Sequence, residues 1–95
     1  MTYKLIITVP AYNDIDNIFA FIANNNIKSA KKLIINFEKQ FDILLKFPNS
    51  GFKPDISQKD IRICVVAKNY QVVYKIDKSK VIILRILTRY QDICI

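Results

Sequence analysis

The sequence contains no histidine and no tryptophan, and it has one glycine in 95 residues. Without histidine there is no Ser-His-Asp triad, no Cys-His nucleophile pair and no ordinary zinc or iron site. A single glycine excludes a glycine-rich phosphate-binding loop. Cys64 and Cys94 are far apart and form no metal-binding or redox motif, so we expect free thiols in a reducing cytosol. Any chemistry must use arginine, lysine, tyrosine, aspartate or the backbone, and we expect neither a metal nor a cofactor.

Long apolar runs are also missing. The N-terminal segment lacks the apolar core and the small-residue cleavage site of a secretory signal. The longest apolar run near the C-terminus, residues 81–84, is far too short to cross a bilayer. We therefore expect a cytoplasmic protein with no membrane contact. Its 95 residues predict one domain, residues 1–95, and the 52% hydrophobic content is ample for a core.

Positive charge is in excess and is unevenly distributed. Fifteen lysines and arginines against eight acids give a net charge of +7. Residues 1–47 hold six basic and four acidic residues, whereas residues 48–95 hold nine basic and four acidic residues. The C-terminal half would therefore attract a nucleic acid, a nucleic-acid enzyme or an acidic protein. A solvated lysine surface that only keeps a small domain soluble would give the same counts.

Hydrophobic periodicity predicts the order strand, helix, helix and three strands. Residues 3–9 are rich in β-branched and aromatic side chains and stop at Pro10, which suits the first position of a helix. Apolar residues then recur at helical spacing up to Ile22 and, more strongly, over residues 30–45, with three asparagines between the two helices. A loop at residues 48–60 follows. After it come three β-rich runs: residues 61–67, 70–76 and 81–88.

This order predicts an α+β fold in which an N-terminal helix hairpin packs on a small, mainly antiparallel sheet. The last strands are apolar on both faces, because Val72 and Val73 are neighbours and so are residues 82–84. A sheet with one wet face should alternate more cleanly. We therefore expect one face to pack on the helices and the other to be available to a partner.

The only arginines lie in the last three strands or just beyond them: Arg62, Arg85 and Arg89. Because Arg85 and Arg89 are four residues apart, they point to one face of an extended strand. Arg62, on another strand, can join them in a cluster that clamps phosphates or stabilises a phosphoryl-transfer transition state. The alternative, which charge alone favours, is that these arginines solubilise the sheet or pair with Asp77 and Asp92.

The tyrosines and cysteines of the last strands give weaker signals. Tyr70 and Tyr74 share one face of their predicted strand and are expected in the core. Tyr90 lies past the last strand and is a candidate for a surface contact or for base stacking. Cys64, inside a β-rich run, is expected to be a small core residue. Cys94 has no base partner and is a poor candidate for a nucleophile.

Taken together in order, these residues resemble the ParE/RelE superfamily of bacterial toxins from type II toxin–antitoxin pairs. The matching positions are Pro10, Ala11, Asp14, Ile15, Ile18, Phe21, Ile22, Asn26, Ala30, Leu33, Leu44, Leu45, Pro48, Gly51, Arg62, residues 70–74, residues 83–87 and residues 89–92. Each motif is weak, but the ordered set covers nearly the whole chain. The resemblance implies the same order of elements that periodicity predicts independently.

The superfamily divides by target. RelE-like members are ribosome-dependent endoribonucleases that cut mRNA with basic residues and often a C-terminal tyrosine, whereas ParE-like members inhibit DNA gyrase and are not known as enzymes. Of the five RelE positions, the chain keeps Arg62 and Arg89 and has Cys64, Gln71 and Ile95 at the others. If the chain is a ribonuclease, the resemblance makes Arg62 and Arg89 its catalytic residues.

The ParE pattern fits the end of the chain better, because an apolar strand runs there into a basic turn. A histidine that is common in that turn is Thr88 here. The resemblance implies that the residues around this turn bind the target: Arg85, Arg89, Tyr90, Gln91 and Asp92.

Three functions stay open, with the first favoured. The chain is a ParE-like toxin that inhibits gyrase and is neutralised by a cognate antitoxin, whose acidic, disordered tail folds over the basic sheet and the helix hairpin. Alternatively, it is a RelE-like endoribonuclease that acts on ribosome-bound mRNA, or a decayed, non-toxic module that still binds its antitoxin. The sequence does not decide whether the chain is an enzyme, with the balance against it, or whether it dimerises alone.

Overall fold

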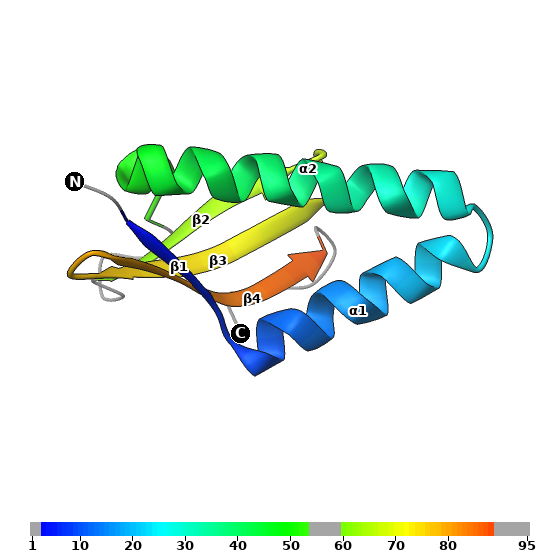
Figure 1. The fold of residues 1–95 in the computed structure, drawn as a ribbon, viewed down its shortest axis with the longest axis horizontal. Helices are drawn as coiled ribbons and strands as arrows, with labels where there is room; N and C mark the ends of the chain where they lie inside the picture. The colour runs from blue at the N-terminus through cyan, green and yellow to red at the C-terminus, as the bar shows by residue number, and fades with distance from the viewer. Residues whose placement is uncertain (1–2, 54–59, 89–95) are drawn as a thin grey trace.

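A computed structural model describes residues 3–53 and 60–88, and its elements follow the predicted order (Figure 1). The elements are β1 (Lys4–Ile7), α1 (Val9–Ala23), α2 (Ile27–Lys46), the short 3-10 helix η1 (Pro48–Ser50), β2 (Ile61–Val66), β3 (Tyr70–Asp77) and β4 (Lys80–Thr88). The predicted α+β fold with an N-terminal helix hairpin is confirmed.

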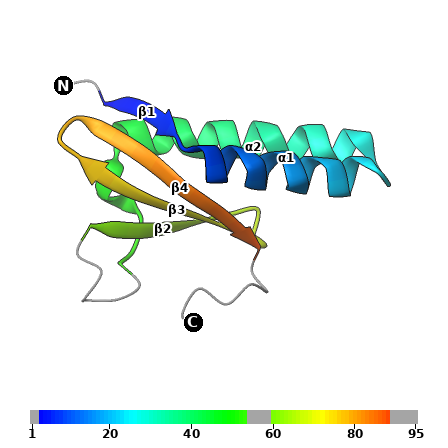
Figure 2. The ribbon, with the colours of Figure 1, turned by 90° about the horizontal axis from the view of Figure 1, so that it is seen from below.

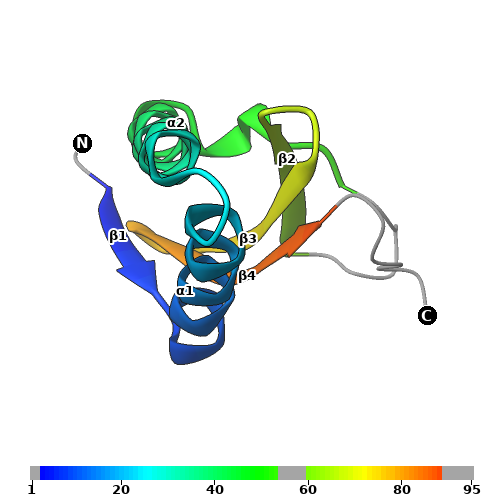
Figure 3. The same ribbon diagram turned by 90° about the vertical axis from the view of Figure 1, so that its right-hand side faces the viewer.

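The four strands form one sheet in the order β1-β4-β3-β2. The β1–β4 pair is parallel and the other two pairs are antiparallel, so the sheet is mainly antiparallel, as predicted. Both helices lie on one side of this sheet (Figure 2), and the end-on view in Figure 3 shows them side by side. Within residues 3–53 and 60–88, no helix is long and apolar enough to cross a membrane.

The first strand ends earlier than predicted, because a helix cap replaces its last residues. We expected a strand up to Val9 and a helix from Pro10. Instead, Thr8 is the N-cap of α1, its Oγ1 accepts the Ala11 N–H at 3.4 Å, and Val9 is the first helical residue. A threonine oxygen that satisfies a free amide of the first turn outweighs the β-propensity of a single valine.

The helix α2 supplies one half of the core. Its buried residues recur at helical spacing: Ala30, Leu33, Phe37, Phe41 and Leu44. The Phe37 ring stacks on Phe41 at 6.4 Å between centroids and forms a T-shaped pair with Tyr70 at 5.8 Å between centroids. The sheet supplies the other half: Cys64, Val66, Val72, Tyr74, Val81, Ile83 and Ile86. The expected core positions of Tyr74 and Cys64 are thus confirmed, while Tyr70 is half-buried against the core.

A bulge in β4 accounts for part of the apolar run near the C-terminus. Val73 pairs with Arg85 and Tyr74 pairs with Ile83, so Leu84 is an extra residue in β4. Because a bulge shifts the alternation by one residue, Ile83 and Ile86 both belong to the core between sheet and helices. The adjacent apolar residues at the bulge therefore do not all indicate that the opposite face of the sheet is apolar.

Candidate protein-binding site

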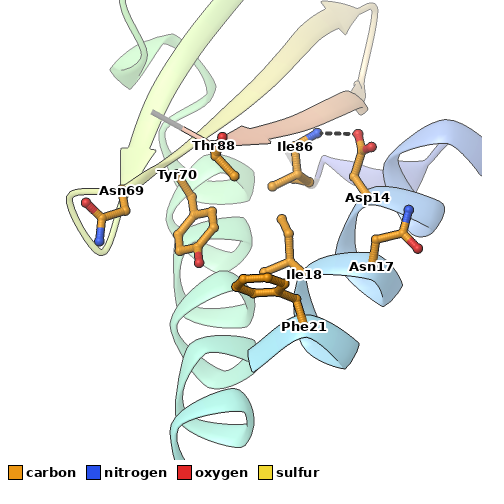
Figure 4. Close-up of a pocket in the computed structure, with 8 residues that line it drawn as sticks. All are labelled: Asp14, Asn17, Ile18, Phe21, Asn69, Tyr70, Ile86 and Thr88. Carbon is orange, nitrogen blue, oxygen red and sulfur yellow. Dashed lines mark hydrogen bonds between the residues drawn. The ribbon is translucent and has the colours of Figure 1, made fainter. Parts of the chain in front are cut away.

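A groove of about 570 Å³ opens between α1, the β2–β3 turn and the C-terminal half of β4. Its lining residues are Asp14, Asn17, Ile18, Phe21, Asn69, Tyr70, Ile86 and Thr88 (Figure 4). The four residues from α1 recur at i, i+3, i+4 and i+7, which places them on one face of the helix. The groove is large enough to take several side chains of another molecule.

Apolar side chains form the inner wall of this groove. Ile86 is buried, and Ile18 and Tyr70 are half-buried against the core. Phe21 is 77% exposed, and Figure 4 shows its ring close to Ile18, on the side of the groove that α1 forms, whereas Tyr70 comes from β3. A large aromatic side chain that stays exposed beside an apolar hollow is typical of a surface that contacts a partner.

The polar rim of the groove exists because β4 is longer than its neighbour. β1 pairs only with the first four residues of β4, and side chains from the start of α1 bond to the edge beyond them. Thr8 Oγ1 donates to the carbonyls of Ile83 at 2.8 Å and Leu84 at 3.1 Å. Asp14 Oδ2 accepts the N–H of Ile86 at 2.9 Å. These caps satisfy edge groups that would otherwise invite pairing with another strand.

Asp14 also binds Arg85 through both carboxylate oxygens. The Nε–Oδ2 distance is 2.7 Å and the Nη2–Oδ1 distance is 3.1 Å, the geometry of a bidentate pair. The Arg85 side chain is 50% exposed and that of Asp14 is 15% exposed. The hydrogen bond to Asp14 raises the pKa of Arg85, with a further contribution from the charge of Asp14. The cation of Arg85 is thus held in place while half of it faces solvent.

The β2–β3 turn, on the other side of the groove, has an unusual backbone. Ala67 and Lys68 have φ angles of 52° and 65°, in the left-handed region that is costly for residues with a Cβ. The Asn69 N–H donates to the Ala67 carbonyl at 2.7 Å, which closes the turn. Such conformations persist only where their surroundings hold them, and they cluster at functional sites.

Arg62 does not join Arg85 in the expected cluster. Arg62 pairs across the sheet with Tyr74, whereas Arg85 pairs with Val73. Tyr74 and Val73 are adjacent in β3 and point to opposite faces, so the two arginines also lie on opposite faces. The prediction of one arginine cluster is therefore wrong for this pair, and Arg85 is bound to Asp14 and not to Asp77.

Arg62 and Tyr74 instead bind the loop that follows α2. Arg62 Nη1 donates to the carbonyls of Asn49 at 3.3 Å and Gly51 at 3.0 Å. Tyr74 Oη donates to the Pro48 carbonyl at 2.6 Å and accepts the Gly51 N–H at 3.0 Å. Burial raises the pKa of Tyr74, so the hydroxyl stays protonated and keeps its donor. We refer to Arg62, Tyr74 and Gly51 together as the loop anchor.

Cys64 is a buried structural thiol. Its burial raises its pKa to about 11, an effect partly offset by a hydrogen bond with the Gln40 side chain. A thiol with this pKa is protonated at neutral pH and does not act as a nucleophile or metal ligand there. In the described part of the chain, no group of three or more histidine, cysteine, aspartate or glutamate residues could hold a metal ion.

Comparison with known proteins places the chain in a family. The model of the ParE toxin of the type II toxin–antitoxin system, parDE, matches residues 5–93. The chain belongs to this family. Toxin ParE3 of Caulobacter vibrioides is 33% identical over 85 residues, which are 88% of this chain and 84% of the relative. A solved structure of the chromosomal ParDE system from P. aeruginosa has the same fold, with a TM-score of 0.75 and 19% identity over 90% of this chain and 95% of the other.

Membership of the ParE toxin family confirms the predicted superfamily, its ParE-like branch and the role of a toxin in a type II toxin–antitoxin system, in which an antitoxin is the second component. Of the residues expected to bind the target, Arg85 lies beside the groove and is bonded to the lining residue Asp14. The others lie outside the described residues: Arg89, Tyr90, Gln91 and Asp92. Cys94 and Ile95 lie outside them as well.

The role of Asp14 in this ParE toxin was not predicted, although the sequence contains a signal for it. The helix α1 has two aspartates and no lysine or arginine, so Asp14 has no cation three or four residues away. An acid without a local partner on a mostly apolar helix indicates a partner distant in sequence. The exposed Phe21 belongs to the same face of α1.

Proposed function

We propose that this ParE-family toxin inhibits DNA gyrase in the cytoplasm and is neutralised by a cognate antitoxin. One observation supports gyrase inhibition over mRNA cleavage: the contacts and protonation of the residues in the sheet at the positions where RelE-like enzymes have catalytic groups. Arg62 donates to loop carbonyls and Cys64 is a buried, protonated thiol. The thiol of Cys64 does not transfer a proton near neutral pH, and the loop carbonyls already use two of the five N–H donors of Arg62.

Gln71 supports the same conclusion. It stands where RelE-like enzymes have an arginine, and an amide brings no positive charge to a developing phosphorane. Its Oε1 is buried and has no hydrogen-bond partner among the described residues. The sheet therefore offers no pair of groups suited to general acid–base catalysis at these three positions.

An antitoxin of acidic, amphipathic character fits the described surface. The chain has a net charge of +7. The groove has an apolar wall, and its lining residue Asp14 is paired with the half-exposed cation of Arg85. An acidic segment would find charge complementarity along the sheet, and its apolar side chains would cover Phe21. Such a segment orders on binding and shields the surface around the groove.

For target binding we propose the residues that follow the groove along β4 and beyond: Arg85, Arg89, Tyr90, Gln91 and Asp92. They bring two guanidinium groups, a phenol and polar side chains to one short stretch. Arginine and tyrosine are the residue types that most often dominate protein interfaces. In this proposal the arginines bind a protein surface and transfer no phosphoryl group.

The test is to induce the protein tightly in bacteria and to pulse-label DNA and protein synthesis over the first minutes. We expect DNA synthesis to fall first, and the purified protein to inhibit supercoiling by purified gyrase. A chain that ends at Thr88 should lose this inhibition and still bind the antitoxin, whereas the full chain does both.

Three other outcomes would contradict the proposal or part of it. If protein synthesis falls first and ribosome-bound mRNA is cut, the chain is a ribonuclease in spite of the substituted positions. If neither synthesis changes while the antitoxin still binds, the chain is a binding module without toxicity. If the shortened chain loses antitoxin binding as well, residues 89–95 belong to the antitoxin surface or to the fold.

A further inference from the structure

We propose that Asp14 is a positioning residue, which orients the guanidinium of Arg85 so that its remaining donors bind a carboxylate of the protein target. The inference rests on the proposed function, because it assigns a partner to a residue of the target-binding set. It goes beyond that function in placing the control of this contact on α1, a helix outside the proposed target-binding stretch.

The first support is the number of bonds on one carboxylate. Asp14 Oδ2 accepts from Arg85 Nε at 2.7 Å and from the Ile86 N–H at 2.9 Å, while Oδ1 accepts from Arg85 Nη2 at 3.1 Å. Asp14 itself lies within α1, whose backbone is fixed by the helix. The plane of the guanidinium is therefore tied to both the helix and the strand, and the long arginine side chain loses most of its rotamer freedom in advance.

The second support is the set of Arg85 N–H donors that the ion pair with Asp14 does not use. A guanidinium has five N–H donors in a fixed fork, and the two bonds to Asp14 use one on Nε and one on Nη2. Three donors are not used by Asp14. The Arg85 side chain is 50% exposed while that of Asp14 is 15% exposed, so the pair presents the cation outward and keeps the anion shielded. An outward, oriented fork of this kind matches the geometry of a carboxylate.

A purely structural role for Asp14 makes a different prediction. The cap on the Ile86 N–H needs only an acceptor, and the side-chain oxygen of an asparagine provides one. The orientation of Arg85 needs both oxygens and the negative charge. The substitution Asp14→Asn therefore separates the two roles, because it can keep the cap while it removes the bidentate ion pair.

The helix offers a matched control two residues away. Asp16 is exposed, lies on the same helix and carries the same charge, so Asp16→Asn makes an identical change of net charge. We expect Asp14→Asn to raise the protein concentration needed for half-inhibition of gyrase supercoiling roughly 2- to 10-fold, the effect of ordering one long side chain at binding. Asp16→Asn should leave that concentration unchanged. The melting temperature of Asp14→Asn should fall by no more than a few degrees, because an asparagine oxygen can keep the bond to the Ile86 N–H and Arg85 is half exposed. That of Asp16→Asn should change less.

Arg85→Lys gives the second readout. A lysine keeps the charge and loses the fork, so it should weaken inhibition by about as much as Asp14→Asn. The double variant should be no worse than either single variant, because both remove the same oriented contact. The proposal is overturned if Asp14→Asn inhibits like the wild type, if its loss merely follows a loss of folded protein, or if the two substitutions add.

A spectroscopic measurement separates this result from a failure of the proposed function. In the wild type, the Arg85 Nε–H should give a protected NMR signal that is lost in Asp14→Asn and kept in Asp16→Asn. If that pattern is found and the wild type does not inhibit gyrase, the proposed target is wrong and the target-binding role of Arg85 falls with it. If the signal is unprotected in the wild type, the orienting role of Asp14 is wrong whatever the target.

Discussion

The loop anchor and the groove each hold an arginine of the same sheet, and they hold it in different ways. Arg62 donates to two neutral backbone carbonyls beside the buried hydroxyl of Tyr74. Arg85 forms a bidentate ion pair with Asp14 and remains half exposed. One arginine therefore completes the hydrogen bonds of a loop, whereas the other is presented to solvent.

The backbone shows the same contrast. Gly51, in the loop anchor, has an ordinary φ of −73°, and it is glycine because a Cβ would lie 2.6 Å from the Tyr74 hydroxyl. Beside the groove, Ala67 and Lys68 occupy the left-handed region in which glycine would be comfortable. The only glycine of the chain serves close packing. Of the three described non-glycine residues with positive φ, two lie in the turn at the groove and the third, Lys78, lies in the β3–β4 turn.

The loop anchor has the properties of a contact that stabilises the fold, whereas the groove has those of a surface that binds a partner. The loop anchor is neutral in its acceptors, closely packed and buried around Tyr74, which is the character of a structural contact. The groove has an apolar wall, includes Asp14 of the half-exposed Asp14–Arg85 ion pair and is bounded by a turn with left-handed residues. These are properties of binding sites on loops and edges. The two arginines of this sheet thus acquire their roles from the acceptors that surround them.

The loop anchor should be disrupted by the addition of a single methyl group at Gly51. In Gly51→Ala the new Cβ would lie 2.6 Å from Tyr74 Oη, 2.8 Å from Tyr74 Cε1 and 2.9 Å from the Ile63 carbonyl. Relief requires movement of a fully buried ring and loss of its hydrogen bonds, so we expect the free energy of unfolding to fall by about 3 kcal/mol. Urea unfolding measures this change.

Asn49→Ala is the control for Gly51→Ala, because it changes an exposed side chain of the same loop and keeps the backbone carbonyl that Arg62 binds. It should change the free energy of unfolding by less than about 0.5 kcal/mol. Equal effects of the two substitutions would show that the loop is merely intolerant of change, and a mild effect of Gly51→Ala would show that Tyr74 has room to move.

Alkaline pH should lower the free energy of unfolding through Cys64, which is buried on the core side of the sheet. The folded thiol has its pKa raised from 9.0 to about 11, so above pH 9 the unfolded chain releases this proton more readily than the folded chain. The stabilisation is complete below pH 9 and is lost as the pH rises to 11, by at most about 2–3 kcal/mol. The difference in the free energy of unfolding between the wild type and Cys64→Ala should therefore decrease from pH 9 to pH 11.

Val66→Ala is the matched control for that experiment. Val66 is buried in the same strand as Cys64 and has no group that titrates, so its gap to the wild type should not depend on pH. A gap for Cys64→Ala that also stays constant between pH 8 and 11 would show that the thiol is not desolvated in the folded protein.

The elements of the fold could be predicted because each rests on a local pattern. The helix α2 has apolar residues at helical spacing on one side and lysines on the other, and Asn26 accepts the Ser29 N–H as an N-cap. The boundary at Thr8 was missed because strand propensity and a capping signal overlap there, and the cap decides it. The bulge at Leu84 has no local signal, since an extra residue is defined by its missing partner in β3.

The candidate site was harder to predict because its contacts join distant residues. Arg85 was identified as a target-binding candidate from its place in the last strand, but its partner Asp14 lies 71 positions away. Neither pattern nor propensity connects such residues, and the uncompensated acids of α1 were the only indication. Arg62 was predicted as one of a cluster, because strand position alone does not show that a loop would supply its acceptors. Ala67 has no preference for a left-handed turn, so this strain could not be foreseen.

The smallest expected effect tests the strain at the groove. Lys68 has a φ of 65°, and its replacement by glycine removes the conflict between the Cβ and the backbone. The gain is partly offset by the greater freedom of glycine in the unfolded chain. We therefore expect Lys68→Gly to raise the free energy of unfolding by about 0.5–1 kcal/mol, which thermal melting would show as a rise of about 2–6 °C.

Asn69→Gly distinguishes this relief of strain from a general benefit of glycine in a turn. Asn69 is the next residue of the same turn and is not among the residues with positive φ, so glycine there brings only the entropic cost and should lower stability. If both substitutions stabilise the protein, glycine is favourable anywhere in this turn, and the effect at Lys68 does not come from strain at that residue. If neither does, the left-handed conformation costs little, and the contrast between the loop anchor and the groove rests on charge and exposure alone.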